Sequence, residues 1–266
     1  LIVVIWFWRK DAKASQEASK EEHQQYEVRL ETLLQEANEI RKEEGVSRLK
    51  QAEGDSLGCS EFLALLLEDE VNTRQDNKRS RLYKEAKLPF EKGLEDFDFS
   101  FQPSIKKQEV LELATCHFLE RKANILFIGQ PGTGKTHLSV SLGLKALGYG
   151  KTVLFSSVWE MIQKLQQSRA DFSYQKKIEE YLRPDLLILD ELGYRSMAEK
   201  TVEDVFEIVS RRYERGSIII TSNRSISEWD KVFIDRTLTT AVVDRLMHHC
   251  TIIEIKGESY RFKKKD

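Results

Sequence analysis

Residues 129–136 read GQPGTGKT and match the pattern G-x-x-x-x-G-K-[ST] at every fixed position. Glycines in such a loop let the backbone turn sharply and aim successive N–H groups at phosphate oxygens. Lys135 supplies a positive charge for the β- and γ-phosphates, and the Thr136 hydroxyl is an oxygen ligand for Mg²⁺. An apolar run enters the loop and an amphipathic stretch leaves it, so the motif has the strand–loop–helix context that it needs. We therefore expect the phosphates of ATP to bind at Gly129, Gln130, Pro131, Gly132, Thr133, Gly134, Lys135, Thr136 and His137.

The loop also limits the architecture, because a loop of this kind joins a β-strand to the crossover helix of a parallel sheet. From Asn124 onward, apolar runs alternate with helical stretches, which is the pattern of such a sheet. Strands are expected at residues 125–128, 152–155, 186–189, 218–221 and 251–255. Helices are expected at residues 105–121, 135–147, 159–167, 174–182 and 201–215. The sequence thus predicts an α/β fold with a parallel five-stranded sheet flanked by helices.

Two acidic residues follow the run 186–189, whose continuous hydrophobicity is typical of a central strand buried on both faces. Asp190 is expected to hold Mg²⁺ through water beside Thr136. Glu191 is expected to accept a proton from the attacking water. An acidic pair after a strand more often serves a helix start, but its position downstream of a phosphate loop favours catalysis.

A polar side chain also stands at the end of the next predicted strand. Asn223 there can orient the water beside the γ-phosphate. The alternative is an asparagine that simply starts a turn. We favour the catalytic role, because doubly wound sheets bind their ligands at the carboxyl ends of the strands.

The chain before the sheet divides into a tail, a helical region and a linker-like stretch. Residues 1–8 (LIVVIWFW) are apolar but far shorter than the ~20 residues that cross a bilayer. We expect residues 1–25 to be a non-globular tail, and the sequence leaves open whether this tail is native. Residues 26–92 carry apolar positions at helical spacing and are expected to form a small all-α domain whose second helix ends before Pro89. Residues 93–103 (GLEDFDFSFQP) look like a linker and open the predicted ATPase domain, residues 93–266.

The overall charge argues against a chain that attracts nucleic acid with its whole surface. The formal net charge is −2, so a contact with DNA must come from a local patch. The second predicted helix carries a candidate, because spacings of three and four residues place several basic side chains on one face. This basic patch consists of Lys78, Arg79, Arg81 and Lys84, with Arg74 and Lys87 beside it. A solvated helix face is the alternative, since Glu70, Asp76 and Glu85 lie nearby.

Other conspicuous residues are interpreted without a binding role. Arg211, Arg212 and Arg215 end a predicted helix, where they would compensate the helix dipole. The three cysteines lack CxxC spacing, so reduced thiols in a cytoplasmic protein are expected. His248 and His249 are adjacent, and we expect their side chains to point apart and not to share a metal.

Several stretches longer than a generic nucleotide-binding signature occur in a fixed order along the chain. They are GQPGTGKTHL, LLILDELGY, VSRRYERGSIIITSNR, EWDKVF, DRLMHH and GESYR. In this order they resemble the IstB helper ATPases of insertion-sequence transposition, relatives of the DnaC and DnaI helicase loaders. The resemblance covers roughly residues 26–262. It implies an AAA+ core with an N-terminal helical domain and without a C-terminal helical lid.

The resemblance also implies roles for single residues. Arg245 would be an arginine finger donated to the ATP of a neighbouring subunit, where such a residue accelerates hydrolysis ~10³–10⁵-fold. Arg261 would be the sensor 2 arginine at the γ-phosphate, and Asn223 the sensor 1 residue. The resemblance favours contact of the basic patch with the DNA backbone. Arg195 and Arg236 depart from the apolar or proline residues usual in the family, a change that could alter subunit or DNA contacts.

Three functions stay open at this point. The leading one is an ATP-dependent DNA-binding helper ATPase that oligomerises on double-stranded DNA and stimulates a cognate IstA-like transposase. The second is a DnaC-like loader that binds a replicative helicase and single-stranded DNA. The third is a nucleotide-switched adaptor with little hydrolysis. ATP and Mg²⁺ are the expected cofactors, further copies of the chain are expected partners, and no membrane contact is expected.

Overall fold

The computed structural model describes residues 59–195, 197–233 and 235–260 of the chain. The chain divides into two compact units, residues 1–75 and 76–266, and the second unit contains the β-sheet. Helix α3 (Cys59–Ala86) spans this division and ends shortly before Pro89. The next residue, Lys87, has a left-handed φ of 54°, which stops the helix. The predicted tail and the rest of the predicted helical domain lie outside the described residues.

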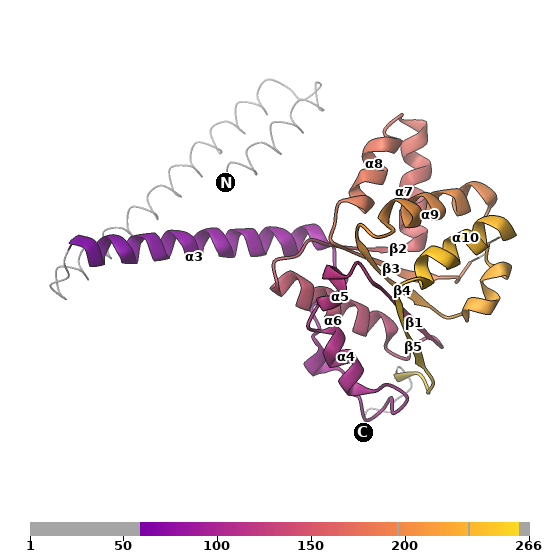
Figure 1. Ribbon diagram of the computed structural model, residues 1–266, viewed down its shortest axis with the longest axis horizontal. Coiled ribbons are helices and arrows are strands. Elements are labelled where there is room, and N and C mark those ends of the chain that lie inside the picture. Colours follow the sequence, from indigo (N-terminus) through magenta and orange to yellow (C-terminus); the bar gives the residue numbers. More distant parts are fainter. Residues whose placement is uncertain (1–58, 196, 234, 261–266) are drawn as a thin grey trace, which may run out of the picture. The chain divides into compact units, whose positions relative to one another are not determined.

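Five parallel strands form a single sheet in the order β2-β3-β4-β1-β5 (Figure 1). They are β1 (Asn124–Gly129), β2 (Val153–Ser157), β3 (Leu186–Leu192), β4 (Ser217–Ser222) and β5 (Cys250–Ile255). All five predicted strands are confirmed, although β3 continues past residue 189 to Leu192. The carboxyl ends of parallel strands share one edge, so the residues that follow β1, β3 and β4 meet there.

Helices cover both faces of the sheet (Figure 1). One face carries the end of α3, η1 (Leu94–Asp96), α4 (Lys107–Leu113), α5 (His117–Glu120) and α6 (Lys135–Gly148). The other face carries α7 (Val158–Ala170), α8 (Tyr174–Leu182), α9 (Glu199–Arg212), η2 (Ile226–Lys231) and α10 (Arg236–Met247). Within the described residues, none of the helices combines the length and the apolar character that crossing a membrane requires.

The helix predicted over residues 105–121 is wrong as a single element. It is interrupted at Cys116, whose φ of 61° is left-handed and ends the helical hydrogen-bond ladder between α4 and α5. The helix predicted over residues 201–215 ends early, at Arg212, because Tyr213 leaves the helical conformation with a ψ of 123° and Glu214 follows with a left-handed φ of 57°. Left-handed turns at residues other than glycine have little signal in composition, which is why both ends were misplaced.

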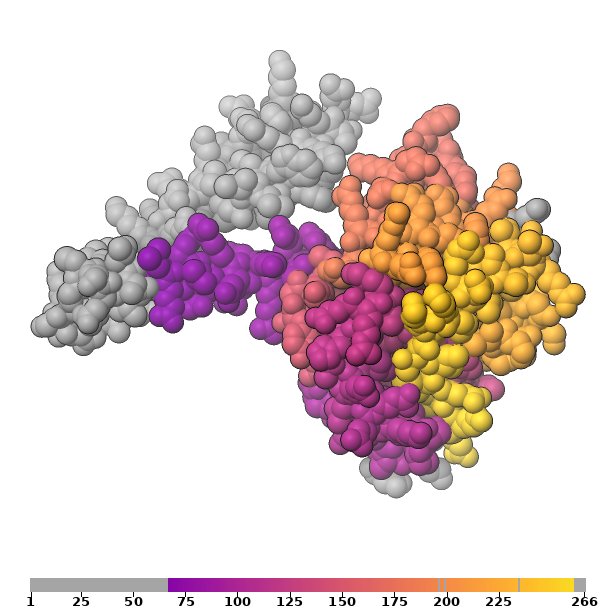
Figure 2. Space-filling model, viewed as in Figure 1, coloured from indigo at the N-terminus to yellow at the C-terminus, as the bar shows by residue number. Residues whose placement is uncertain are grey.

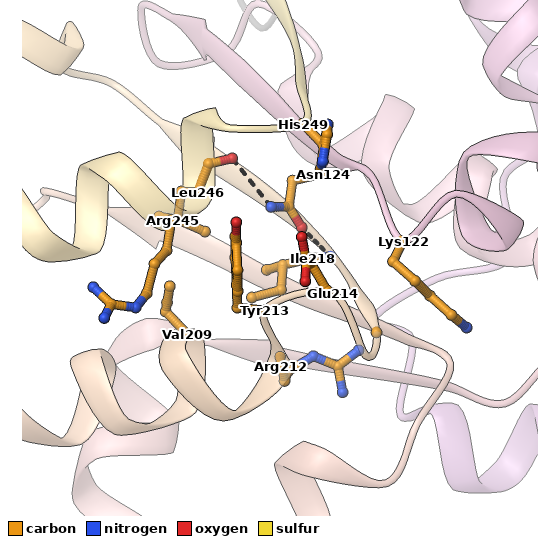
Figure 3. A pocket seen from close by; sticks show the side chains of 11 residues that line it. Lys122, Asn124, Val209, Arg212, Tyr213, Glu214, Ile218, Arg245, Leu246 and His249 are labelled. Atoms are coloured by element: carbon orange, nitrogen blue, oxygen red, sulfur yellow. Dashed lines mark hydrogen bonds between the residues drawn. The ribbon is translucent and has the colours of Figure 1, made fainter.

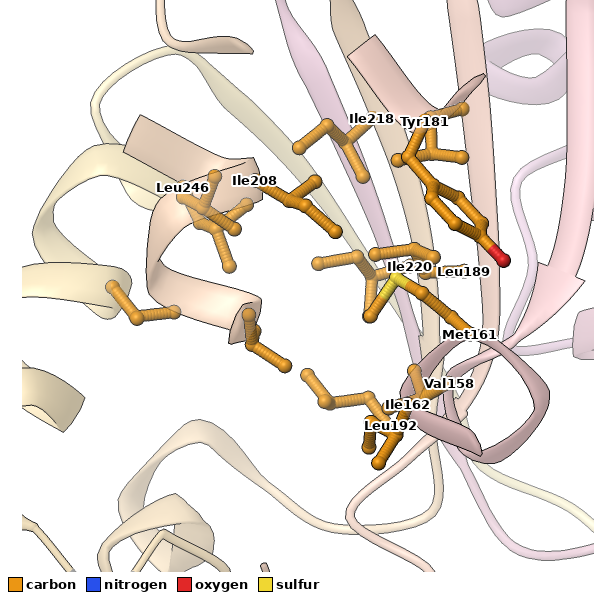
Figure 4. Packing of buried hydrophobic residues seen from close by; sticks show 14 of the residues in the cluster. Val158, Met161, Ile162, Tyr181, Leu189, Leu192, Ile208, Ile218, Ile220 and Leu246 are labelled. Atoms are coloured by element: carbon orange, nitrogen blue, oxygen red, sulfur yellow. The ribbon is translucent and has the colours of Figure 1, made fainter. Parts of the chain in front are cut away.

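Alternate residues of each strand pack into two hydrophobic cores, one on each face of the sheet. Leu126 packs on the side of α7–α10, whereas its neighbours Ile125 and Phe127 pack on the side of α4–α6. Figure 4 shows side chains of β3 and β4, such as Leu189, meeting those of α7, such as Met161. Full burial of each such side chain contributes ~1.5–3 kcal/mol. The central strands are therefore held firmly, and so are the polar residues at their ends.

The edge strand β5 pairs with β1 along its whole length, which joins the end of the described chain to the start of the sheet. In the space-filling view, atoms of α10 and β5 (yellow) lie at the surface beside those of α4 and α5 (magenta) (Figure 2). The backbone N–H of Asn124, the first residue of β1, donates to the carbonyl of His249 at 2.7 Å. The turns before β5 are thus fixed to the amino end of the sheet.

Candidate nucleotide-binding site

The predicted phosphate loop leaves the end of β1 and enters α6 at Lys135. Gly132 and Gly134 have φ values of 83° and 97°, a region that favours glycine. A Cβ on Gly134 would lie 2.5 Å from a ring carbon of Phe97, so a side chain has no room there. The loop can therefore curve closely around an anion at the N-terminus of a 14-residue helix.

The side chain of Lys135 is buried along the inside of this loop. Its Nζ donates to the carbonyl oxygens of Gly129 at 2.7 Å and of Gln130 at 2.9 Å. The Thr133 hydroxyl donates to the same Gln130 carbonyl at 2.8 Å. These bonds hold the positive charge beside the loop backbone, where we predict the phosphates to lie.

The Asp190 carboxylate, at the end of β3, joins the loop to two strands. It accepts hydrogen bonds from the Thr136 hydroxyl at 3.0 and 3.1 Å and from the Thr221 hydroxyl of β4 at 2.5 Å. The Thr221 hydroxyl in turn accepts the backbone N–H of Glu191 at 2.9 Å. Sequence reasoning brought Thr136 and Asp190 together but missed Thr221, whose only signal was its position two residues before Asn223. Asp190 is 7% exposed, so this network is largely shielded from water.

Glu191 differs from Asp190 in being exposed to solvent. Its backbone has a left-handed φ of 64°, and the pairing of β3 with β4 is irregular at this point. A left-handed backbone at a residue other than glycine is strained and is typical of functional sites. The Glu191 side chain is exposed and lines a separate pocket of about 160 Å³ with Trp159, Tyr194 and Arg195. The Arg195 guanidinium lies 4.6 Å from the centre of the Trp159 ring.

Asn223 follows β4 at a point where the ends of β3 and β4 are tied together. The Ser222 hydroxyl donates to the Leu192 carbonyl at 2.8 Å, and Nε of Arg224 donates to the Gly193 carbonyl at 2.9 Å. The side-chain oxygen of Asn223 is buried and finds no hydrogen-bond partner within the described part of the chain. A buried polar atom without a partner costs ~1–3 kcal/mol, so this oxygen is suited to bind water or a ligand.

A pocket of about 240 Å³ lies over the phosphate loop. It is lined by Phe90, Asp96, Phe97, Asp98, Gln102, Gly132, Thr133, Gly134, Lys135, Thr136, His137 and Tyr260. The stretch 93–103, expected to be a linker, therefore forms one wall of the pocket. Nε2 of His137 hydrogen-bonds the Gly93 carbonyl at 2.9 Å, and its ring meets the Phe97 ring edge-on at 5.3 Å. The interleaved aromatic residues of that stretch were the signal for this wall.

The oxygen donors at the loop fit a magnesium ion. Thr136 offers a hydroxyl and Asp190 a carboxylate, 3.0 Å apart, and both face the same hydrogen-bond network. Mg²⁺ prefers such hard oxygen ligands, one or two from the protein with the rest from water and phosphate. The arrangement is therefore compatible with the predicted metal position.

Arg245 lies at the opposite end of the sheet from the phosphate loop. It belongs to the last turn of α10, where its Nη1 donates to the Ala241 carbonyl at 2.9 Å and its guanidinium lies 5.1 Å from the centre of the Phe206 ring. It lines a small hollow together with Asn124, the first residue of β1, and Figure 3 shows its guanidinium directed away from that hollow. The structure does not bring Arg245 together with the loop of its own chain.

Arg261, the other arginine expected at the phosphates, lies outside the described residues. Its neighbour Tyr260 donates its backbone N–H to the Gly132 carbonyl at 2.9 Å. The described chain thus ends at the phosphate loop. A nucleotide contact by Arg261 stays a prediction.

Arg212 does more than compensate a helix dipole. Its guanidinium is 1% exposed and donates to five backbone carbonyls, those of Tyr181, Leu182, Pro184, Asp185 and Ser217, at 2.8–3.3 Å. Burial lowers the pKa of Arg212 to about 10, with Asp185 opposing the shift, so the group remains charged at neutral pH. Arg212 therefore holds the end of α8 and the starts of β3 and β4 together.

The basic patch lies on the exposed side of α3. Its four residues, Lys78, Arg79, Arg81 and Lys84, are all exposed. Leu82 and Ala86 of the same helix are buried in the core, so this part of α3 is fixed to the sheet-containing unit. Arg81 lies 3.9 Å from Glu85, a contact that leaves its charge largely solvated. DNA binding by this patch stays a prediction.

A parallel sheet in this strand order, a phosphate loop after β1 and an acidic residue bonded to that loop define a P-loop ATP-binding protein of the AAA+ kind. The model of the family "IstB-like ATP binding protein" matches residues 27–266, and the chain belongs to this family. The predicted family is thereby confirmed.

Relatives and solved structures agree with this assignment. "Insertion sequence IS21 putative ATP-binding protein" of Pseudomonas aeruginosa is 42% identical over 219 residues, which cover 82% of this chain and 83% of that one. "Replication initiator DnaA bound to AMPPCP and single-stranded DNA" superimposes with a TM-score of 0.52 at 26% identity, covering 65% of this chain and 52%, about half, of that one. The structure of DnaI gives a TM-score of 0.53 at 19% identity, covers 62% of this chain and 92% of that one, and shows the same fold. The predicted AAA+ fold is confirmed.

Proposed function

We propose that this chain hydrolyses ATP, oligomerises on double-stranded DNA and stimulates a cognate IstA-like transposase. The observation that carries the proposal is the Asp190 carboxylate, which bonds Thr136 of the loop at 3.0 Å and Thr221 of β4 at 2.5 Å. Next to it stands Glu191, held by its backbone bond to Thr221. A site that only retained a Mg²⁺-bound nucleotide would need the loop and Asp190 but not Glu191 as a base.

The residues divide the work of hydrolysis among them. Lys135 and the loop N–H groups hold the β- and γ-phosphates. Glu191 accepts a proton from the water that attacks the γ-phosphorus, while the bond from that phosphorus to the β-phosphate oxygen breaks. The unpartnered amide oxygen of Asn223 orients the water. Mg²⁺, held by Thr136 and Asp190, would neutralise charge on the phosphates.

The proposal includes oligomerisation because Arg245 cannot reach the phosphate loop of its own chain. The loop follows Gly129, whereas Arg245 lies beside Asn124, and the strand between these two residues spans roughly 17 Å. If Arg245 stabilises the transition state, it must therefore act on the ATP of a neighbouring copy of the chain. Hydrolysis would then depend on oligomerisation.

Family membership and the basic patch support the DNA-directed part of the proposal. The family's relatives are named after insertion sequences. The patch on α3 offers four exposed cations, Lys78, Arg79, Arg81 and Lys84, for phosphate groups. Binding through such contacts is independent of sequence and weakens steeply with salt.

A helicase loader is the second candidate, favoured by the shared fold with DnaI. A loader would prefer single-stranded DNA and a replicative helicase over duplex DNA and a transposase. A nucleotide-switched adaptor would bind DNA with a different affinity in its ATP-bound and ADP-bound states, and it would hydrolyse almost no ATP. These three functions differ in measurable outputs.

The test combines duplex binding with transposase stimulation. Fluorescence anisotropy of labelled duplex and single-stranded DNA is measured with ATP, ADP and no nucleotide at moderate salt, and strand transfer is measured with an IstA-like transposase. We expect ATP-dependent retention of duplex, its loss in Lys78→Glu/Arg79→Glu/Arg81→Glu, and faster strand transfer. The matched control Lys106→Glu/Lys107→Glu/Arg121→Glu reverses three exposed charges elsewhere and should bind normally. Preference for single strands, or normal duplex binding by the patch variant, would contradict the proposal.

A further inference from the structure

Three side chains with metal-binding chemistry converge at the amino end of the sheet, away from the nucleotide site. Glu214 lies in the turn between α9 and β4, and His248 and His249 lie between α10 and β5. One ligand atom from each lies within 4.8 Å of the other two. All three residues are exposed, so an ion has direct access.

The expectation that the two histidines point apart is wrong. Their ring centres are 4.1 Å apart, with 35° between the ring planes. The reason lies in the backbone: His248 still has helical φ and ψ, −53° and −43°, as the C-cap of α10, whereas His249 already turns into β5. The alternation of side chains that holds along a strand does not apply across such a change of direction.

The backbone that presents these groups is fixed to the sheet. Asn124 donates its backbone N–H to the His249 carbonyl at 2.7 Å and its side-chain N–H to the Leu246 carbonyl at 3.1 Å. Its side-chain oxygen accepts the N–H of Ile218 at 2.9 Å (Figure 3). The segments that carry the histidines and Glu214 are therefore connected through one asparagine. Metal-binding side chains need such a rigid base.

A second group orients one of the imidazoles. The Tyr213 hydroxyl hydrogen-bonds Nδ1 of His248 at 2.6 Å, and the two rings are stacked with centres 5.8 Å apart. A hydrogen bond to one ring nitrogen is the usual way in which a metal-binding histidine is oriented. The exposed cluster is thus more ordered than three surface side chains on separate loops would be.

We propose that Glu214, His248 and His249 bind one Zn²⁺ ion. Two imidazoles and a carboxylate are a recurrent set of three protein ligands for zinc, with a fourth position left for water. Mg²⁺ is disfavoured, because it prefers oxygen ligands only. The ion ties the turn before β4 to the turn before β5, at the end of the helix that carries Arg245. The three proposed zinc ligands are not among the residues proposed to act in ATP hydrolysis or DNA binding.

The test measures zinc affinity directly, on the full chain without a histidine tag and without nucleotide. Competition with a chromophoric chelator at neutral pH should give one tightly bound Zn²⁺ per chain. His248→Ala/His249→Ala should weaken binding at least ~100-fold, and Tyr213→Phe, which keeps the ring but loses the hydroxyl, about 10-fold. His117→Ala, which removes an exposed histidine of α5, should bind as the unchanged chain does.

Two results would overturn the proposal. One is the absence of stoichiometric zinc binding by the unchanged chain. The other is unchanged affinity in the double histidine variant, which would place any bound zinc elsewhere. Glu214→Gln guards against a folding artefact, because it keeps the shape of the side chain and the surface turn. It should lose at least ~10-fold in affinity while its unfolding temperature without zinc stays that of the unchanged chain.

Discussion

The two ends of the β-sheet use polar side chains in opposite ways. At the carboxyl end, the Thr136 and Thr221 hydroxyls both donate to the largely buried Asp190 carboxylate. At the amino end, Arg212 is buried and donates to five backbone carbonyls, whereas Arg245 is partly exposed and donates to the Ala241 carbonyl of its own helix. The first end is suited to bind a nucleotide with groups from a single chain. The second end stabilises the fold and presents charge outward.

In the proposed function, the two ends of the sheet affect ATP hydrolysis in different ways. Under the proposed function, the carboxyl end binds the phosphates with groups from one chain, and its geometry depends on the packing of β3 and β4. Under the same proposal, the amino end contributes to hydrolysis, through Arg245, only when another copy of the chain lies beside it. A substitution at the carboxyl end should therefore impair the ATP site of the subunit that carries it. A substitution of Arg245 should instead impair the ATP site of the neighbouring subunit.

The largest effect is expected from Arg245→Ala. ATP turnover, measured by phosphate release with DNA present, should fall ~10³-fold or more, because an arginine supplied in trans stabilises the charge of the transition state. Nucleotide affinity should stay unchanged, and mixing with Lys135→Ala subunits should restore part of the turnover. Arg215→Ala, an exposed arginine at the same end of the sheet, is the control with full turnover expected. Failure of the mixture to recover would show that the two ends do not meet across a subunit interface.

Glu191→Gln should give the next largest effect, at the other end of the sheet. The amide cannot accept a proton from water, so turnover should fall ~10²–10⁴-fold while ATP binding persists. The left-handed backbone at this position is retained, because the change leaves the main chain untouched. Glu203→Gln, an exposed glutamate of α9, should behave as the unchanged chain. A turnover rate unaffected by Glu191→Gln would favour the nucleotide-switched adaptor.

The carboxyl end could be predicted from sequence far better than the amino end. Its phosphate loop and acidic pair are contiguous motifs with a fixed strand context, so spacing alone brings Thr136 and Asp190 together. Thr221 was missed because its role arises from strand order: β4 lies between β3 and β1, which no local pattern reveals. The wall formed by residues 93–103 was missed for a similar reason, since aromatic residues near a Gly and a Pro also occur in linkers.

At the amino end, composition was misleading. Arg212 stands in a run of basic residues, and only the structure distinguishes the buried guanidinium of Arg212 from the partly exposed one of Arg211. His248 and His249 were expected to point apart because they are adjacent, a rule that holds along a strand but not at the junction of a helix and a strand. Buried carbonyl partners and changes of chain direction are tertiary facts, which explains both errors.

The neighbouring arginines of α9 offer the next test of the comparison. Arg212→Met should lower the free energy of unfolding by about 3–5 kcal/mol, because five carbonyls lose a charged donor and those that stay buried are left unsatisfied. Arg211→Met should cost at most about 1 kcal/mol, since its ion pairs with Glu179 and Glu207 are well exposed to solvent. Urea denaturation measures both. Similar losses in the two variants would contradict a structural role specific to Arg212.

The smallest effect is expected from Thr221→Val, which keeps the shape of the side chain and removes its hydroxyl. The Asp190 carboxylate then loses the 2.5 Å bond and the Glu191 N–H loses its acceptor, both near a strained backbone. We expect a loss of about 1–3 kcal/mol in the free energy of unfolding, measured by urea denaturation, together with slower ATP turnover. Thr221→Ser restores the hydroxyl and should recover turnover even where stability remains lower. If the valine and serine variants turn over ATP equally, the hydroxyl supports the fold of the carboxyl end but not its chemistry. The contrast between a catalytic carboxyl end and a structural amino end then becomes weaker.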